Sequence, residues 1–341
     1  MKLEAKTERL LLHFRQPAGT SRGVYTTRTI WLVRLTQGGR TGVGECAPLP
    51  DLSCDAMDDD AYDDLLTRAC EDLCLSGHID TDALRPYPSI LFGLETAMLN
   101  LQNGDRLFDT AFSRGEAGIP INGLVWMGSY DEMLRRIEEK LEKGFRCVKL
   151  KIGAIGFEEE LSLVRHIRSR FSSHDVELRL DANGAFSCDM ALRMLEQLSP
   201  YHVHSIEQPI RQGQWTQMSR LCQESPLPIA LDEELIGIND TETKRHLLRV
   251  IKPRYIILKP SLHGGMAGCR EWIDMARDMG IGSWITSALE SNIGLNAIAQ
   301  FAAAVYGDDI SMPQGLGTGQ LFTDNIPMPL EIRGDRLWRC R

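Results

Sequence analysis

Two lysines, Lys149 and Lys151, stand on one short apolar segment of this 341-residue chain. The segment runs from Phe145 to Ile152 and stops at Gly153. In a β-strand, residues two apart point to the same face, so both amines would project side by side. Neighbouring ammonium groups in an interior repel each other, which lowers the free energy needed to deprotonate one of them. The pair could supply a base, although an edge strand with two solvated lysines has the same pattern.

Three acidic residues end three later apolar segments at nearly constant spacing. Asp181, Glu207 and Asp232 follow one another at steps of 26 and 25 residues. Such a step is one strand–helix unit, so the three carboxylates would meet at the carboxyl ends of neighbouring parallel strands. Three oxygen ligands with no His or Cys beside them suit Mg²⁺, with Mn²⁺ as the alternative ion. The other interpretation is that each acid is an ordinary N-cap of the next helix.

A further lysine, Lys259, ends the apolar stretch that follows the third acid, while Lys151 stands one unit before the first. Amines on both flanks of a divalent cation can remove a proton next to a bound carboxylate and balance the charge of the enediolate that results. The residue types therefore indicate proton abstraction from a small carboxylate substrate.

The elements that must position these residues are short β patterns alternating with amphipathic helical patterns. We expect strands at 119–125, 146–152, 177–181, 204–207, 229–232, 255–259 and 282–286, with a short one near Ile310. We expect helices at 131–143, 158–171, 190–198, 215–224, 242–250, 266–279 and 294–305. This alternation builds a parallel sheet covered by helices, and eight strands in about 200 residues close a barrel.

The region before the barrel has a different pattern. Alternating segments at 7–16 and 24–36 predict a hairpin with a polar tip loop at 16–23, and a third strand ends in a Gly- and Pro-rich turn at 42–50. An Asp-rich start then leads into helices that reach residues 75 and 103. We therefore predict an α/β protein: an N-terminal α+β capping domain (1–117), a TIM-like (β/α)7β barrel (118–320) and a C-terminal segment (321–341) that returns to the capping domain.

The composition limits the kinds of partner. Hydrophobic residues make up 43% and charged residues 25% of the chain, as in globular proteins. The net charge of -9 and the lack of a basic cluster argue against a nucleic-acid partner. No stretch has the roughly 18 apolar residues of a membrane span, and no signal-like segment begins the chain, which predicts a cytoplasmic protein without a membrane partner. The nine cysteines form no Cys-x-x-Cys pair and are expected to be reduced.

Five short motifs point to a known family. They occur in this order, one per expected strand: Lys149-Leu150-Lys151, Asp181-Ala182-Asn183-Gly184, Glu207-Gln208-Pro209, Asp232-Glu233 and Lys259-Pro260. In these motifs the chain resembles the enolase superfamily over most of its length, a superfamily in which a lysine or histidine base works with Mg²⁺. Within it, segments 44–50, 287–291 and 315–319 are most similar to the o-succinylbenzoate synthase family.

The resemblance implies a role for each residue. Lys151 would remove the α-proton and then help expel the neighbouring hydroxyl by syn elimination, with Lys149 lowering its pKa and Lys259 stabilising the enediolate. The carboxylates that would bind Mg²⁺ are Asp181, Glu207 and Asp232. The expected substrate contacts are Asn183, Ser261, Ser287 and Glu290. Segments 17–23 and 48–52 would close over the barrel. The implied reaction converts 2-succinyl-6-hydroxy-2,4-cyclohexadiene-1-carboxylate to o-succinylbenzoate in menaquinone biosynthesis.

Two other functions fit parts of the pattern. Lysines on opposite sides of a site could exchange an α-proton between faces, as an N-acylamino-acid or dipeptide racemase does. A barrel without catalytic activity could act as a binding or scaffold protein, but it would have no need of a full set of strand-end ligands. The sequence leaves the oligomeric state open.

Overall fold

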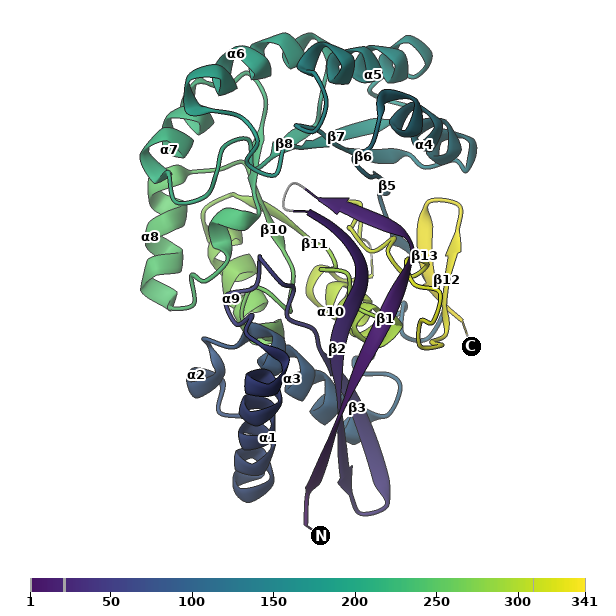
Figure 1. The fold of residues 1–341 in the computed structure, drawn as a ribbon, viewed down its shortest axis with the longest axis vertical. Coiled ribbons are helices and arrows are strands. Elements are labelled where there is room, and N and C mark those ends of the chain that lie inside the picture. The colour runs from purple at the N-terminus through teal and green to yellow at the C-terminus, as the bar shows by residue number, and fades with distance from the viewer. Residues whose placement is uncertain (1, 21–22, 309, 341) are drawn as a thin grey trace.

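The computed structural model describes residues 2–20, 23–308 and 310–340. Its first part, drawn in purple and blue in Figure 1, is a three-stranded antiparallel sheet with helices packed against it. The strands, in spatial order, are β1 (Glu4–Thr20), β2 (Gly23–Gln37) and β3 (Arg40–Cys46). The helices are α1 (Asp59–Ser76), α2 (Thr81–Leu84) and α3 (Pro88–Asn103).

The β1–β2 hairpin is longer than predicted. Pairing resumes at Ala18↔Tyr25 and continues to Thr20↔Gly23, so the prediction of a loop over residues 18–20 is wrong. The register is irregular between His13 and Ala18, and the stretch between them contains Pro17, which has no N–H for the ladder. The predicted tip residues 21 and 22 lie outside the described residues.

Helix α3 lies directly on strand β3 because both elements carry glycines where they meet. A Cβ on Gly44 would overlap the carbonyl oxygen of Gly93, so a larger residue at either position would push the helix off the sheet. Beside this contact, the rings of Trp31 and Tyr62 pack with their centroids 4.3 Å apart. This close approach fixes the position of β3, whose carboxyl end leads toward the barrel.

The second part is a curved parallel sheet surrounded by helices, as predicted (Figure 1). Its strands, in spatial order, are β5 (Gly123–Val125), β6 (Cys147–Lys151), β7 (Glu177–Asp181), β8 (Ser205–Glu207), β9 (Ile229–Leu231), β10 (Tyr255–Leu258) and β11 (Gly282–Ile285). Its α-helices are α4 (Tyr130–Glu142), α5 (Phe157–Arg170), α6 (Cys188–Leu198), α7 (Trp215–Glu224), α8 (Thr241–Ile251), α9 (Gly265–Asp278) and α10 (Asn292–Tyr306). Two short 3₁₀ helices are η1 (Ser199–Tyr201) and η2 (Glu233–Leu235). The predicted helices are all present, which confirms the barrel-type fold.

The sheet closes on itself through single residues rather than through an eighth strand of ordinary length. Gln314 forms a parallel bridge with Ile121, and Gly315 forms one with Thr286. The Gln314 side chain also accepts a 2.7 Å hydrogen bond from the backbone N–H of Ile285. The predicted strand near Ile310 is therefore wrong, because the closing residues lie farther along the chain.

The predicted strand 119–125 is two strands with different partners. Its second half, β5, belongs to the barrel, whereas β4 (Ile119–Pro120) pairs antiparallel with β13 (Arg336–Arg339), which in turn pairs with β12 (Leu330–Arg333). The chain divides at Ile121, whose N–H donates to the carbonyl of Asp335 over 2.8 Å.

The segment before this hairpin lies along β1. The N–H of Arg15 donates to the carbonyl of Leu321 (2.8 Å), and the N–H of Thr323 donates to that of His13 (2.9 Å). The stretch after residue 320 thus contacts both the first sheet and the base of the barrel. The domain boundaries at 117 and 320 stay predictions.

Two carboxylates of the first part, the buried Glu45 and the partly buried Glu95, cap barrel helices. Glu95 accepts hydrogen bonds from the N–H groups of Met266 (2.6 Å) and Ala267 (3.0 Å) in α9. Glu45 accepts from the N–H groups of Ser291, the N-cap residue of α10, and of Gly294 in its first turn (both 2.8 Å). Burial raises the pKa of Glu45 and of Glu95 to about 7 in each case, although these hydrogen bonds oppose the shift. The joint between the two parts therefore includes two carboxylates that titrate near neutral pH.

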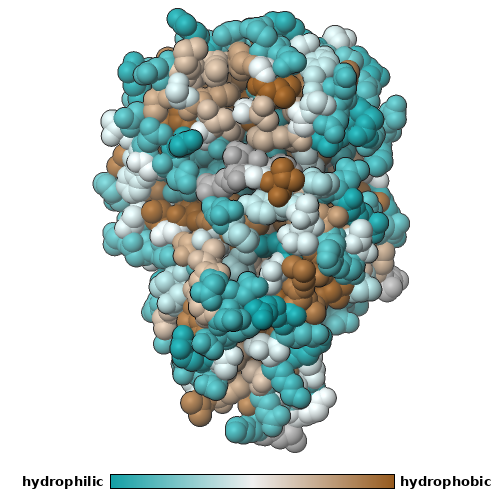
Figure 2. Space-filling view, viewed as in Figure 1, coloured by the Kyte–Doolittle hydropathy of each residue, from teal (hydrophilic) through white to brown (hydrophobic). Residues whose placement is uncertain are grey.

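On the surface of the molecule seen in Figure 2, apolar residues form separate patches among hydrophilic ones. Within the described residues, no helix combines the length and apolar character needed to cross a membrane.

Candidate active site

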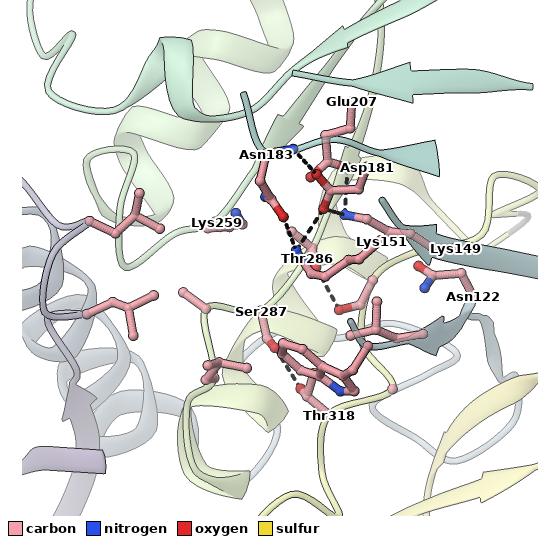
Figure 3. A pocket seen from close by; sticks show the side chains of 18 of the residues that line it. Asn122, Lys149, Lys151, Asp181, Asn183, Glu207, Lys259, Thr286, Ser287 and Thr318 are labelled. Carbon is pink, nitrogen blue, oxygen red and sulfur yellow. Dashed lines mark hydrogen bonds and ion pairs between the residues drawn. The ribbon is translucent and has the colours of Figure 1, made fainter. Parts of the chain in front are cut away.

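The strand register brings the predicted lysines and carboxylates together at the carboxyl ends of β6 to β10. Lys151, Asp181 and Glu207 are direct partners across three neighbouring strands, and Lys149 lies two residues earlier on the same face of β6. Asp232 and Lys259 come directly after β9 and β10. All three acids and both lysines of β6 are buried. Figure 3 shows five of these side chains, Lys149, Lys151, Asp181, Glu207 and Lys259, around one cavity, with Lys259 on the other side of Asn183 from Lys151.

Every carboxylate of this group contacts a lysine. Lys149 Nζ donates to Glu207 Oε2 (2.6 Å) and lies 2.9 Å from Asp181 Oδ2, which also accepts from Lys151 Nζ (3.0 Å). On the far side, Lys259 donates to the carboxylate of Asp232.

The electrostatics of the cluster are set by burial and by the contacts between lysines and carboxylates. Burial lowers the pKa of Lys149, but the carboxylates of Asp181 and Glu207 outweigh burial and raise it above its ordinary value. Burial raises the pKa of Asp181, yet Lys149 and Lys151 bring it well below its usual range. Burial and the neighbouring Asp181 raise the pKa of Glu207 well above its usual range. The two carboxylates thus favour the charged form of Lys149 in this arrangement.

Two carboxylate oxygens at this centre are unsatisfied. Glu207 Oε1 and Asp232 Oδ1 are buried and have no hydrogen-bond partner among the described residues. A buried anionic oxygen without a donor is costly, and a hard divalent cation is the ligand that such oxygens bind best. The described residues hold no group of three or more His, Cys, Asp or Glu already gathered around one point, since each acid turns an oxygen toward a lysine. The donor set fits Mg²⁺ or Mn²⁺, which would compete with the lysines for these oxygens.

Asn183 links Lys151 of β6 to Glu233, a carboxylate that was not predicted as a site residue. Its backbone is left-handed (φ 44°) and its N–H donates to Asp181 Oδ1 over 3.0 Å. Its side-chain oxygen accepts from Lys151 Nζ (2.7 Å), and its amide donates to Glu233 Oε1 (2.9 Å). Glu233 Oε2 is buried and unpartnered in the described chain. The Asp232-Glu233 motif was the only sequence signal for this residue.

The cavity has a polar side and an apolar side. Asn183 and Ser287, two of the predicted substrate contacts, line it, and Ser287 forms a 2.6 Å hydrogen bond with Thr318 on the wall opposite the lysines (Figure 3). The apolar side comes from both parts of the chain, through Tyr25, Leu49, Leu52, Trp126 and Leu289.

The other two predicted substrate contacts lie outside the cavity lining. Glu290 is fully buried and accepts hydrogen bonds from the hydroxyl of Ser261 and from the N–H of Ala288, the latter over 2.6 Å. Their polar groups are directed at each other, so in this arrangement Ser261 and Glu290 hold the 287–291 segment. Direct substrate contact by these two residues stays a prediction.

Comparisons with known proteins cover both parts of the chain. The family described as "Enolase C-terminal domain-like" matches residues 132–336, and the family described as "MenC, N-terminal domain" matches residues 20–101. An o-succinylbenzoate synthase of Desulfotalea psychrophila is 46% identical to this chain, with 98% of each chain covered. The crystal structure of MenC from Desulfotalea psychrophila LSv54 matches with a TM-score of 0.84 at 42% identity, covering 99% of this chain and 100% of that one.

A more distant structure shares the fold. A dipeptide epimerase from Enterococcus faecalis V583, crystallised with Mg and the dipeptide L-Leu-L-Tyr, matches with a TM-score of 0.83 at 18% identity. The match covers 100% of this chain and 98% of that one.

Proposed function

The chain belongs to the enolase superfamily and, within it, to the o-succinylbenzoate synthase family, and from this premise we propose how its residues carry out the reaction. The reaction is the dehydration of 2-succinyl-6-hydroxy-2,4-cyclohexadiene-1-carboxylate to o-succinylbenzoate, a step of menaquinone biosynthesis. The observation that carries the proposal is the row of lysines and carboxylates across β6 to β8, which faces Lys259 in one cavity that also has an apolar side.

Asp181, Glu207 and Asp232 would hold the divalent cation, with Mg²⁺ as the ion that enzymes of this superfamily generally use and Mn²⁺ as the alternative. The two unpartnered oxygens, Glu207 Oε1 and Asp232 Oδ1, support this assignment. When bound, the ion acts as a Lewis acid on the substrate carboxylate and makes the adjacent C–H more acidic.

Lys151 is the base of the proposed mechanism. As a neutral amine it has two N–H bonds, and the structure offers two acceptors for them, Asp181 Oδ2 at 3.0 Å and Asn183 Oδ1 at 2.7 Å. With both hydrogens held in this way, the nitrogen lone pair is left for the proton next to the substrate carboxylate. Asn183 thereby orients the base, and Glu233 in turn orients Asn183.

The two other lysines act as fixed charges. Lys149 keeps its proton because Asp181 and Glu207 raise its pKa despite burial, so it stays a cation next to the substrate carboxylate. The pKa of Lys259 is also raised, since Asp232 and Glu233 outweigh its burial, which leaves a second cation to stabilise the enediolate from the other side.

The elimination step returns the enzyme to its starting state. Lys151 takes the proton from C1 of the ring and, now an ammonium, gives a proton to the hydroxyl on C6 of the same face. The C6–O bond breaks as the C1–C6 double bond forms, so water leaves and the ring becomes aromatic. One amine thus serves as base and then as acid.

The test follows the absorbance of the cyclohexadiene substrate with and without a chelator. We expect rapid loss of absorbance that stops with EDTA and returns with added Mg²⁺, and we expect it to be absent in Lys151→Ala. Lys143→Ala is the matched control, because this lysine is exposed beyond the end of α4. A chain that leaves the diene unchanged with Mg²⁺ present contradicts the proposal.

The same samples test the alternative activity, in which Lys151 and Lys259 exchange a proton between faces. Incubation with N-succinyl amino acids in D₂O would then give deuterium exchange at the α-carbon without any dehydration of the diene. That pattern would identify a racemase or epimerase and would exclude the synthase.

A further inference from the structure

Arg28 of β2 is buried in the joint between the two parts of the chain, with 3% of its surface exposed. Its guanidinium donates only to backbone carbonyls, and these belong to two separate segments. The acceptors are Pro48 O (2.5 Å), Ala47 O (2.7 Å), Leu289 O (3.4 Å) and Ala288 O (3.4 Å). One side chain therefore joins a turn of the first part to a turn of the barrel.

Both turns form the apolar wall of the active-site cavity. The first leads directly into Leu49 and Leu52, and the second contributes Ala288 and Leu289. Leu289 has a left-handed backbone (φ 65°), a conformation that is strained for a residue with a side chain. Because its carbonyl accepts from Arg28 Nε, the guanidinium helps to hold this peptide in its strained conformation.

The charge of Arg28 is not needed for a direct ion pair. Among the described residues no carboxylate lies within ion-pair distance of it, and Glu290 and Glu45 act on it only at longer range. A buried cation without a contacting anion is costly, and an apolar side chain would fill the same joint at lower free energy. What an apolar side chain lacks is the planar set of donors that can reach carbonyls of two segments at once.

We propose that Arg28 is a positioning residue that sets the wall of Leu49, Leu52 and Leu289 against the ring and succinyl chain of the substrate. This inference rests on the proposed function, because that function supplies the occupant of the wall. Arg28 itself is not among the residues that line the cavity. The lysines and carboxylates belong to other strands, so loss of Arg28 should weaken substrate binding more than it slows proton transfer.

The test measures kcat and KM separately for Arg28→Met and Arg28→Lys. We expect Arg28→Met to raise KM at least about tenfold while kcat falls less than about threefold. Arg28→Lys should restore little of the lost substrate binding, so its KM should stay high, since an ammonium cannot span both turns. The matched control is Arg85→Met: Arg85 also joins the first part to the barrel, through Glu271 at 2.8 and 3.0 Å, but is not part of the cavity lining. Arg85→Met should lower the melting temperature and leave KM within about twofold of the wild-type value.

A second measurement keeps the test independent of turnover and folding. Trp126 and Trp284 line the cavity, so titration with o-succinylbenzoate can be followed by tryptophan fluorescence. We expect weaker binding in folded Arg28→Lys than in wild type. Wild-type KM and product affinity in a folded Arg28 variant would overturn the inference, as would an equal rise of KM in Arg85→Met.

Failure of the proposed function gives a different pattern. If the wild type exchanges the α-proton of N-succinyl amino acids but does not dehydrate the diene, the synthase assignment fails while KM for exchange still tests Arg28. A wild type that neither binds the product nor turns over either substrate would overturn both.

Discussion

Replacing Lys259 by methionine should reveal whether Asp232 binds a cation. Asp232 is 0% exposed, one of its oxygens contacts Lys259 and the other has no partner among the described residues. Methionine keeps much of the side-chain volume but removes the only ammonium that this carboxylate contacts. Breaking one partner of a buried ion pair leaves an uncompensated charge, which costs roughly 3–5 kcal/mol. We expect a loss of that size in the free energy of unfolding when EDTA is present.

A bound divalent cation should reduce this loss. The ion stabilises the wild type as well, so the deficit falls only as far as the variant binds Mg²⁺ more tightly than the wild type does. We expect tighter binding, because in Lys259→Met no ammonium competes with the ion for Asp232. A hundredfold lower dissociation constant would reduce the deficit by about 2.7 kcal/mol, to roughly 1–2 kcal/mol in saturating Mg²⁺. The assay is urea unfolding of wild type and variant, each with EDTA and with Mg²⁺.

The control for this experiment is Lys244→Met. Lys244 is 1% exposed and pairs with Glu271 over 2.9 Å, but neither residue lines the cavity. Its deficit should be the same with and without Mg²⁺. An equal deficit of Lys259→Met under both conditions would refute the assignment of Asp232 as a metal ligand.

Three further predictions concern the base, the joint and the packing of the first sheet. Lys151→Ala should lower kcat for dehydration by about 10²–10⁴-fold with an unchanged circular dichroism spectrum, and wild-type turnover would exclude it as the base. Burial raises the pKa of Glu95 from 4.5 to about 7. The folded wild type should therefore lose on the order of 3 kcal/mol of stability as the pH rises through that range. The side chain of Glu95→Gln does not titrate, so the variant has no such loss. The stability of Glu95→Gln relative to wild type should therefore improve between about pH 5 and pH 8 in urea unfolding, and a constant difference would contradict the assigned pKa. Gly44→Ala should lower the free energy of unfolding by roughly 3 kcal/mol, because its Cβ would overlap Gly93. Gly39→Ala should lower it by about 1 kcal/mol, because residue 39 has open space around it but a φ of 79°. Equal losses in the two variants would argue against the close contact.

The positions of the strand-end carboxylates and lysines could be predicted because each depends on local sequence. A short apolar run fixes a strand, the alternation of side chains fixes the face, and the carboxyl end of the strand fixes the height in the barrel. These rules sufficed to bring Lys151, Asp181 and Glu207 together in one row.

Residues on the turns could not be placed in this way. Glu290 follows a left-handed Leu289, and that turn directs its carboxylate to Ser261 and Ala288 instead of the cavity. Glu233 begins the 3₁₀ helix η2, whereas a continued strand would have pointed it away from Asp232.

Two features depend on long-range partners. The pKa of Lys149 depends on carboxylates 32 and 58 residues away in the chain, which a count of neighbouring amines does not include. Within the described residues, the barrel is closed by Gln314 and Gly315, too short a stretch for an alternation pattern. Local sequence carries no signal for either feature.

The pairing of β4 with β13 determines when the fold can be completed during synthesis. Pro120 pairs with Arg336, so the ribosome must add more than 200 residues before the first of these strands meets its partner. At about 5–20 residues per second this takes roughly 10–40 s. During that time β4 lacks its partner, and its unpaired N–H and C=O groups can pair with another chain. The fold thus makes the growing polypeptide dependent on protection from aggregation until its C-terminal hairpin emerges.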